Sequence, residues 1–194
     1  VLGDELPFPY LQNRICFPIL DAFGDLVTYI GRLYQGEYAK HLTKYLFLPF
    51  EKSSLVYGVD KAKKATNSYC WLVEGVFDAV YLSVCGFDNA VAALGSSISF
   101  FQAAIIKRYW DYCIIIPDND DAGIKGANKS KKMLDAFGVK TFIPELPYDV
   151  GCDFGDYFQT NSMLATEYLN KWERMYIIRQ EKEAPNLVEA LQRK

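Results

Sequence analysis

Residues 71–97 read WLVEGVFDAVYLSVCGFDNAVAALGSS, and residues 112–139 read YCIIIPDNDDAGIKGANKSKKMLDAFGV; these two stretches decide the fold. In each, a short apolar run ends on an acidic residue and turns through glycine into a helical pattern. The first run ends at Glu74 and the second leads into Asp118. A strand that ends on a carboxylate presents it at the carboxyl edge of the sheet, where open α/β sheets bind ligands.

Two such strands side by side would gather four carboxylates, those of Glu74, Asp78, Asp118 and Asp120. Carboxylates this close repel one another at neutral pH, so they need protons or cations nearby. Hard oxygen ligands with no neighbouring His or Cys favour Mg²⁺ or Mn²⁺. Such ions commonly serve phosphoryl transfer, in which they stabilise the attacking and leaving oxygens. The residues alone therefore predict a divalent-metal site for phosphoryl transfer.

The pattern of apolar residues predicts that strands and helices alternate between residues 69 and 143. We expect strands at 69–73, 89–93, 112–117 and 139–143, and helices at 76–86, 99–109 and 123–137. Short apolar strands that alternate with helices are typical of an α/β fold with a parallel sheet, helices on both faces and right-handed crossovers.

The flanking segments carry their own signals. Upstream, apolar runs on either side of Asp21–Asp25 predict a β-hairpin with glycine in its turn. Downstream, residues 161–183 predict one long helix that Pro185 ends, followed by a polar tail. Its expected apolar stripe contains Leu164, Tyr168, Leu169, Trp172, Met175, Tyr176 and Ile178.

The composition indicates a globular protein. Of the 194 residues, 51% are hydrophobic and 15% aromatic, which favours a filled core over disorder and fits one domain or one domain with a smaller lobe. No apolar run approaches the roughly 20 residues that span a membrane, and we see no signal-peptide pattern. Five scattered cysteines and a single histidine argue against a zinc site and suit a reducing cytoplasm.

The net charge of −3 is unusual for a protein that binds nucleic acid, but the charge is unevenly distributed. Residues 69–160 carry seven basic and twelve acidic side chains, a net charge of −5, whereas the segments before and after each carry +1. The negative charge is therefore concentrated around the predicted metal site. Bound cations would offset part of it.

At these residues the sequence resembles a known family. Glu74-Gly75-x-x-Asp78 on a strand-to-helix turn, followed by Asp118-x-Asp120 with Ala-Gly after it, resembles the Toprim signature of topoisomerases and primases. The wider pattern is similar to bacterial DnaG-type primases in particular. In that family an Ala-x-Leu-Gly-Thr-like loop follows the second strand, and here residues 93–96 read ALGS.

Four weaker matches precede this signature in the order that the family shows. They are Arg14-Ile-Cys-Phe-Pro-Ile19, Gly31-Arg32, Lys44-Tyr45-Leu46 and Val56-Tyr57-Gly58. These upstream matches depart from the family in one place, where the Asn-Ser that follows Tyr-Leu in the family is replaced by Phe47-Leu48. The resemblance leaves open an origin in a phage or another mobile element.

The resemblance implies a catalytic core in three parts. Residues 1–68 would be part of an N-terminal mixed α+β lobe, residues 69–160 a Toprim domain, and residues 161–194 a C-terminal helix with a polar tail. The implied activity is that of a DNA primase, a DNA-directed RNA polymerase and nucleotidyltransferase of DNA replication. It joins ribonucleoside triphosphates into a short RNA primer on a single-stranded DNA template by a two-metal mechanism. A replicative helicase is the implied partner, and no membrane is involved.

The family also implies roles for individual residues. Glu74, Asp118, Asp120 and Asp153 would bind Mg²⁺ or Mn²⁺, and Asp78 would complete the catalytic cluster. Asp153 matches a third acidic element of the family, although an N-cap role for Asp153 or Asp156 fits the sequence equally. Glu74 could be a metal ligand or a proton acceptor.

Two basic residues, Arg32 and Lys44, would face the nucleotide or template, because fixed positive groups are needed to hold phosphates near the metals. For either residue alone, a solvated surface position is the simple alternative.

Two other functions fit the same residues. One is a Toprim-type nuclease or topoisomerase fragment, which breaks phosphodiester bonds. The other is a non-catalytic module that binds nucleic acid or a protein partner and needs no metal. A G-x-x-x-x-G-K-[ST] pattern is absent from the sequence, so it encodes no P-loop ATPase.

Overall fold

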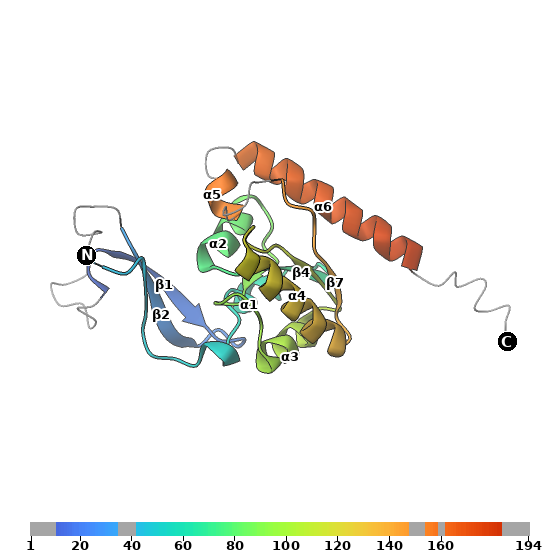
Figure 1. Ribbon diagram of the computed structural model, residues 1–194. Helices are drawn as coiled ribbons and strands as arrows, with labels where there is room; N and C mark the ends of the chain where they lie inside the picture. The colour runs from blue at the N-terminus through green and yellow to red at the C-terminus, as the bar shows by residue number, and fades with distance from the viewer. Residues whose placement is uncertain (1–10, 35–41, 148–153, 159–161, 184–194) are drawn as a thin grey trace.

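The structure, a computed structural model, describes residues 11–34, 42–147, 154–158 and 162–183. It contains two sheets (Figure 1). An antiparallel sheet has the order β1 (Arg14–Leu20), β2 (Leu26–Leu33), β3 (Tyr45–Phe47). A parallel sheet has the order β5 (Ala90–Ala92), β4 (Tyr69–Val73), β6 (Tyr112–Ile115), β7 (Lys140–Phe142).

Helices lie between and after these strands. They are η3 (Lys52–Ser54), α1 (Val59–Ala62), α2 (Val76–Val84), α3 (Phe100–Tyr109), α4 (Asp121–Ala136), α5 (Phe154–Phe158) and α6 (Ser162–Glu183). The predicted α/β fold with a parallel sheet is confirmed, and each predicted strand and helix is present. The ends differ by a few residues. The helix predicted to reach residue 86 stops at Val84, because Gly86 adopts a φ of 94°, which ends the helical turn.

The predicted hairpin between β1 and β2 is also confirmed. Gly24 adopts a φ of 96° in its turn, a conformation that side-chain-bearing residues rarely take. The carboxylate of Asp21 accepts hydrogen bonds from the backbone N–H groups of Phe23, Gly24 and Asp25. The sequence Asp-Ala-Phe-Gly-Asp thus fixes the turn through a side-chain acceptor and one glycine.

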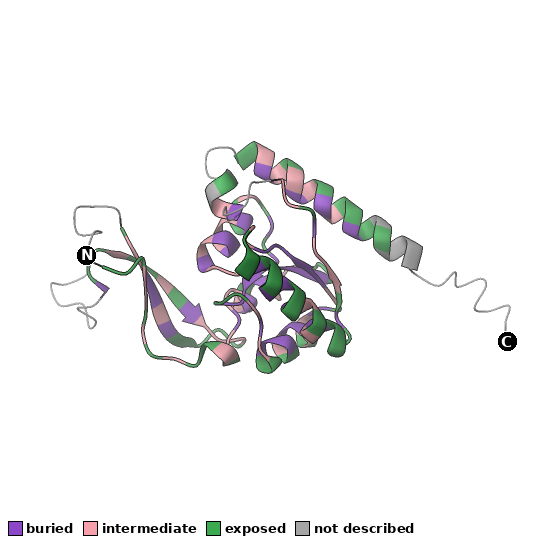
Figure 2. Ribbon diagram, viewed as in Figure 1, coloured by how far each residue is buried: buried purple, intermediate pink, exposed green. Residues whose placement is uncertain are grey.

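The core has two halves, one on each face of the parallel sheet. All five residues of β4 are buried, which explains its continuous apolar sequence. Trp71 and Val73 pack with α2, α5 and α6, whereas Cys70 and Leu72 pack with α1, α3 and α4. Figure 2 shows the buried residues concentrated in the sheet and on the inner sides of its helices. Helices therefore cover both faces, as predicted.

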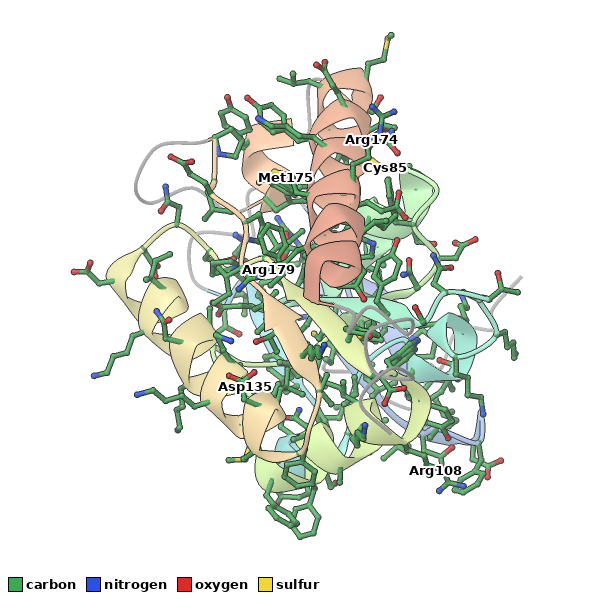
Figure 3. The ribbon with its side chains drawn as sticks, turned by 90° about the vertical axis from the view of Figure 1, so that its right-hand side faces the viewer. Cys85, Arg108, Asp135, Arg174, Met175 and Arg179 are labelled. Atoms are coloured by element: carbon green, nitrogen blue, oxygen red, sulfur yellow. The ribbon has the colours of Figure 1, made fainter. Side chains whose placement is uncertain are left out.

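Helix α6 packs on the sheet through a stripe at helical spacing. Ala165, Leu169, Trp172 and Tyr176 are buried, and the hydroxyl of Tyr69 in β4 donates a hydrogen bond to Glu173. The prediction that Met175 belongs to this stripe is wrong. It lies one residue, or about 100° around the helix, from Tyr176 and is 45% exposed on the face seen in Figure 3.

No helix in the described ranges has both the length and the apolar character that crossing a bilayer requires. The cysteines at positions 16, 70, 85 and 113 are free thiols.

We predict that Trp172→Ala lowers the free energy of unfolding by about 3–5 kcal/mol, because it removes a buried aromatic side chain and leaves a cavity. Urea unfolding followed by circular dichroism would measure it. Met175→Ala is the matched control on the same helix and should change the free energy of unfolding by less than about 1 kcal/mol. Equal effects of the two substitutions would contradict the packing described for α6.

Candidate active site

A hollow of about 280 Å³ lies between the antiparallel sheet and the carboxyl edge of the parallel sheet. From the antiparallel sheet it is lined by Ile30, Lys44, Tyr45 and Phe47. From the parallel sheet and its loops it is lined by Glu74, Gly75, Val76, Asp78, Leu94, Gly95 and Asp118. Three of the four predicted cluster carboxylates and one predicted basic residue thus meet in one space.

A larger hollow of about 710 Å³ lies between β1, α1 and α2. Its acidic side chains are Asp60 and Asp88, and none of the predicted site residues lines it. Size alone therefore does not identify the site; the chemistry of the lining does.

Glu74 follows the last residue of β4, and its carboxyl group is strongly perturbed by its surroundings. Burial, followed by the negative charges of Asp118 and Asp120, raises the pKa of Glu74 to about 7, although the backbone N–H of Asp118 partly opposes this. The Oε1 atom is buried and has no hydrogen-bond partner. Glu74 thus carries an acceptor oxygen that a proton or a cation would satisfy.

Asp118 and Asp120 follow β6, but their side chains are used differently. Asp118 lines the hollow. Asp120 is the N-cap of α4, and its carboxylate accepts a 2.6 Å hydrogen bond from the backbone N–H of Gly123. A Cβ on Gly123 would clash with the carbonyl oxygen of Asp118 and crowd Oε1 of Glu74. The glycine at position 123 is therefore a steric requirement of the site.

Asp78, in the first turn of α2, lines the hollow but is only 8% exposed. Its Oδ1 atom accepts a 3.1 Å hydrogen bond from the backbone N–H of Gly155 in α5. Its Oδ2 atom lies close to Gly75, which leaves no space for a side chain there. Asp78 thus connects the Glu74–Gly75 turn to α5.

The loop after β5 is fixed to the end of β4 and to α4. The backbone N–H of Leu94 donates a 3.0 Å hydrogen bond to the carbonyl of Glu74, and Leu94 adopts a φ of 62°. A Cβ on Gly126 of α4 would overlap the carbonyl of Ser96, and Ser130 Oγ accepts a hydrogen bond from the N–H of Ile98. The glycine and serine of α4 therefore let this loop lie against the helix.

The two predicted basic residues are placed differently. Lys44 lines the hollow opposite the carboxylates. Arg32 does not line it. Its guanidinium lies 4.1 Å from the ring centroid of Phe77 in α2 and donates a 2.8 Å hydrogen bond to the hydroxyl of Tyr45. Arg32 therefore joins β2 to α2 beside the hollow.

Gln102 was missed at the level of sequence. It is buried, and its Nε2 atom donates to the carbonyls of Leu55 and Ala93, both at 2.7 Å. It therefore ties the segment before α1 to the loop after β5. The sequence pattern that could have drawn attention to Gln102 is Ser99-x-x-Gln102, which forms a capping box at the start of α3.

The carboxylate oxygens of the hollow supply some, but not all, of the ligands that a divalent cation needs. Among the described residues, no three His, Cys, Asp or Glu side chains lie close enough to form a metal site by themselves. Asp153, the predicted further ligand, lies outside the described residues. The unsatisfied Glu74 oxygen beside Asp118 is the feature that fits a hard cation, since both groups offer carboxylate oxygens.

Two family models match the chain. Residues 71–158 match the model described as Toprim-like, and residues 4–63 match the N-terminal domain of the DNA primase catalytic core. A DNA primase of Staphylococcus aureus (strain COL) is 32% identical over 138 residues, which are 70% of this chain and 23% of that protein. A DNA primase of Synechococcus elongatus is 33% identical over 158 residues, covering 78% of this chain and 23% of its own length. The chain thus spans about a quarter of the length of these relatives.

Solved structures agree with these matches. The zinc-binding and RNA polymerase domains of the Aquifex aeolicus primase superpose with a TM-score of 0.73 at 28% identity, covering 93% of this chain and 45% of that one. A DnaG primase catalytic domain bound to single-stranded DNA superposes with a TM-score of 0.70 at 26% identity, covering 84% of this chain and 53% of that one.

Gly123→Ala should lower the free energy of unfolding by about 1–3 kcal/mol, because the added Cβ forces Asp118 or Glu74 to move. Chemical denaturation would measure this change. Gly95→Ala is the matched control in the same site, since a Cβ there meets nothing within 4 Å. A Gly123→Ala variant as stable as the Gly95→Ala variant would contradict the close packing of the three elements.

The pKa of Glu74 predicts a pH dependence of stability. The folded-state pKa of about 7 lies above the ordinary value of 4.5, so the folded protein holds the proton more tightly than the unfolded chain. Stability should therefore fall as pH rises from about 4.5 through 7. Glu74→Gln should remove this part of the fall, which melting temperatures between pH 5 and 8 would reveal.

The control for this comparison is Glu145→Gln, at an exposed carboxyl group outside the hollow. It should keep the pH dependence of the unsubstituted protein. If the melting temperatures of Glu74→Gln and Glu145→Gln depend on pH in the same way, the claim that burial and nearby negative charges raise the pKa of Glu74 is wrong.

Proposed function

The chain belongs to the family of bacterial DnaG-type DNA primases, within the catalytic core, and from that premise we propose that it joins ribonucleoside triphosphates into short RNA primers on single-stranded DNA. The observation that carries the proposal is the meeting of Glu74 and Asp118 in one hollow, with Lys44 on the opposite wall. Carboxylates for cations and an ammonium for phosphates are the groups that nucleotidyl transfer requires.

Glu74, Asp118 and Asp120 are the residues that would hold Mg²⁺ or Mn²⁺, with Asp153 as the further ligand expected from the family. When bound, the ions supply the positive charge that lowers the pKa of the attacking 3′-hydroxyl and neutralises the triphosphate. Asp120 can contribute while it caps α4, because a carboxylate has two oxygens and the cap uses one of them.

We assign Glu74 the role of ligand rather than proton acceptor. Its raised pKa reflects burial and two negative neighbours, and both effects are reversed when positive charge enters the hollow. An ionised Glu74 beside a cation is a weak base. The same residue is therefore better suited to hold charge in place than to take a proton from the substrate.

The basic residues have separate roles in this proposal. Lys44, which lines the hollow, would contact the phosphates of the nucleotide. Arg32 would act through Tyr45, because its guanidinium is already engaged with the Tyr45 hydroxyl and the Phe77 ring. Template contact by Arg32 would use the donors that these two partners leave available.

The proposed partners follow from the family. They are a single-stranded DNA template, ribonucleoside triphosphates, the RNA primer and a replicative helicase. Relatives with bound DNA support the first of these, including the RNA polymerase domain of the Mycobacterium tuberculosis primase with a double-stranded DNA oligomer that carries a 6-nucleotide overhang. The helicase rests on family membership alone.

A primer-synthesis assay with single-stranded template, ribonucleotides and Mn²⁺ tests the proposal. Asp118→Asn should reduce oligoribonucleotide synthesis by at least about 100-fold, since loss of even outer partners of a bound metal costs 10–100-fold. Asp111→Asn is the matched control. It removes the same charge at the opposite end of β6, where Asp111 is exposed and pairs with Lys107.

Two outcomes would contradict the polymerase proposal. Metal-dependent nicking of DNA without primer synthesis would favour a Toprim-type nuclease. Absence of Mn²⁺ binding by calorimetry would favour a module that binds nucleic acid or a partner without catalysis.

A further inference from the structure

An exposed aromatic ring stands on the wall of the hollow opposite the carboxylates. Phe47 ends β3, lines the hollow and remains 36% exposed, although its partner across the sheet, Ile30, is 1% exposed. Tyr45 lies two residues earlier in the same strand, so both side chains leave the strand on the same side. A large apolar ring in contact with solvent costs free energy, which a bound apolar surface would recover.

The ring is held in one orientation. The Nζ atom of Lys52 lies over one face of the ring, 3.3 Å from its centroid, and the centroid of the Phe50 ring lies 6.4 Å from that of Phe47 with an interplanar angle of 27°. A base that stacks on Phe47 must therefore use the face away from Lys52. The centroid of the Tyr45 ring, two residues earlier in β3, lies 6.4 Å from the centroid of the Phe47 ring. A ring that neighbours already fix loses little conformational freedom when a ligand packs against it.

We propose that Phe47 is a stacking platform for a nucleobase in the hollow. This inference rests on the proposed function, because it takes the ligand to be a nucleotide or a nucleic-acid strand. The hollow then offers one group for each part of that ligand: the Phe47 ring for the base, the Lys44 ammonium for phosphate, and the carboxylates of Glu74 and Asp118 for its cation. Stacking on an aromatic ring accepts any base, since every base has a π-face.

Two ligands carry the required base, namely the incoming ribonucleotide and the template strand. They share the stacking chemistry and differ in length and charge. Binding measurements with ATP and with a short oligodeoxynucleotide, both in Mg²⁺, separate them.

Fluorescence of Phe47→Trp provides a direct test. The three native tryptophans, Trp71, Trp110 and Trp172, are at most 3% exposed, so an added ligand should scarcely affect their emission. A new tryptophan at position 47 should be quenched by ATP or by the oligonucleotide, and inorganic triphosphate should not quench it. Phe101→Trp is the matched control, because Phe101 is 62% exposed on α3 and does not line the hollow.

Affinity provides the second test. Phe47→Leu keeps an apolar side chain but has no ring, so it should weaken binding of the stacked ligand about 5- to 100-fold, whereas Phe47→Tyr should bind within about 3-fold of the unsubstituted protein. The ligand whose affinity falls is the one that stacks. Melting temperatures of both variants verify that each is folded; if Phe47→Leu is unfolded, the Phe47→Trp response decides.

The inference is overturned if neither ligand quenches the tryptophan at position 47, if triphosphate quenches it equally, or if Phe101→Trp responds to the same extent. It is also overturned if a folded Phe47→Leu variant binds both ligands unchanged. Quenching by ATP or the oligonucleotide but not by triphosphate, in a protein that makes no primers, would support the stacking site and refute the polymerase proposal. Primer synthesis by a protein that shows no such quenching would support the polymerase proposal and refute the stacking site.

Discussion

The site depends on one constraint: two paired strands bring carboxylates that repel each other to the same edge of the sheet. Strands β4 and β6 are parallel neighbours at the centre of their sheet, with Leu72 opposite Ile115. Their chains therefore leave the sheet at the same edge, and Glu74 and Asp118 follow within three residues of that pair. Burial is the main cause of the raised pKa of Glu74, and the negative charges of Asp118 and Asp120 add to it. A cation relieves this repulsion, which links the topology to the proposed chemistry.

Much of the surrounding sequence holds this edge in place. Gly123 and Gly126 keep α4 close to Asp118 and to the loop after β5, where side chains would not fit. Asp78 connects the turn after β4 to α5, and Gln102 connects the same loop to the segment before α1. These contacts are close approaches and hydrogen bonds from side chains to the backbone rather than apolar packing, so small substitutions there should alter geometry more than core volume.

The fold was largely predictable because its signals are local. The central strands β4 and β6 are short apolar runs that lead into acidic residues, and the helices repeat their apolar positions. The convergence of Glu74 and Asp118 followed from the rule that parallel strands share one carboxyl edge. The position of Arg32 could not be predicted, because its engagement with Phe77 joins residues 45 positions apart. Phe47 could be noticed only as a departure from the family pattern; its exposure and its place in the hollow required the packing of β3 against the sheet edge.

The most direct test of the central claim is the location of Mn²⁺ by anomalous scattering in crystals of the protein. We predict a peak in the hollow, bonded to carboxylate oxygens of both Glu74 and Asp118. Mn²⁺ that binds elsewhere, or that touches only one of these two residues, would contradict the claim that the two strand ends form one cation site.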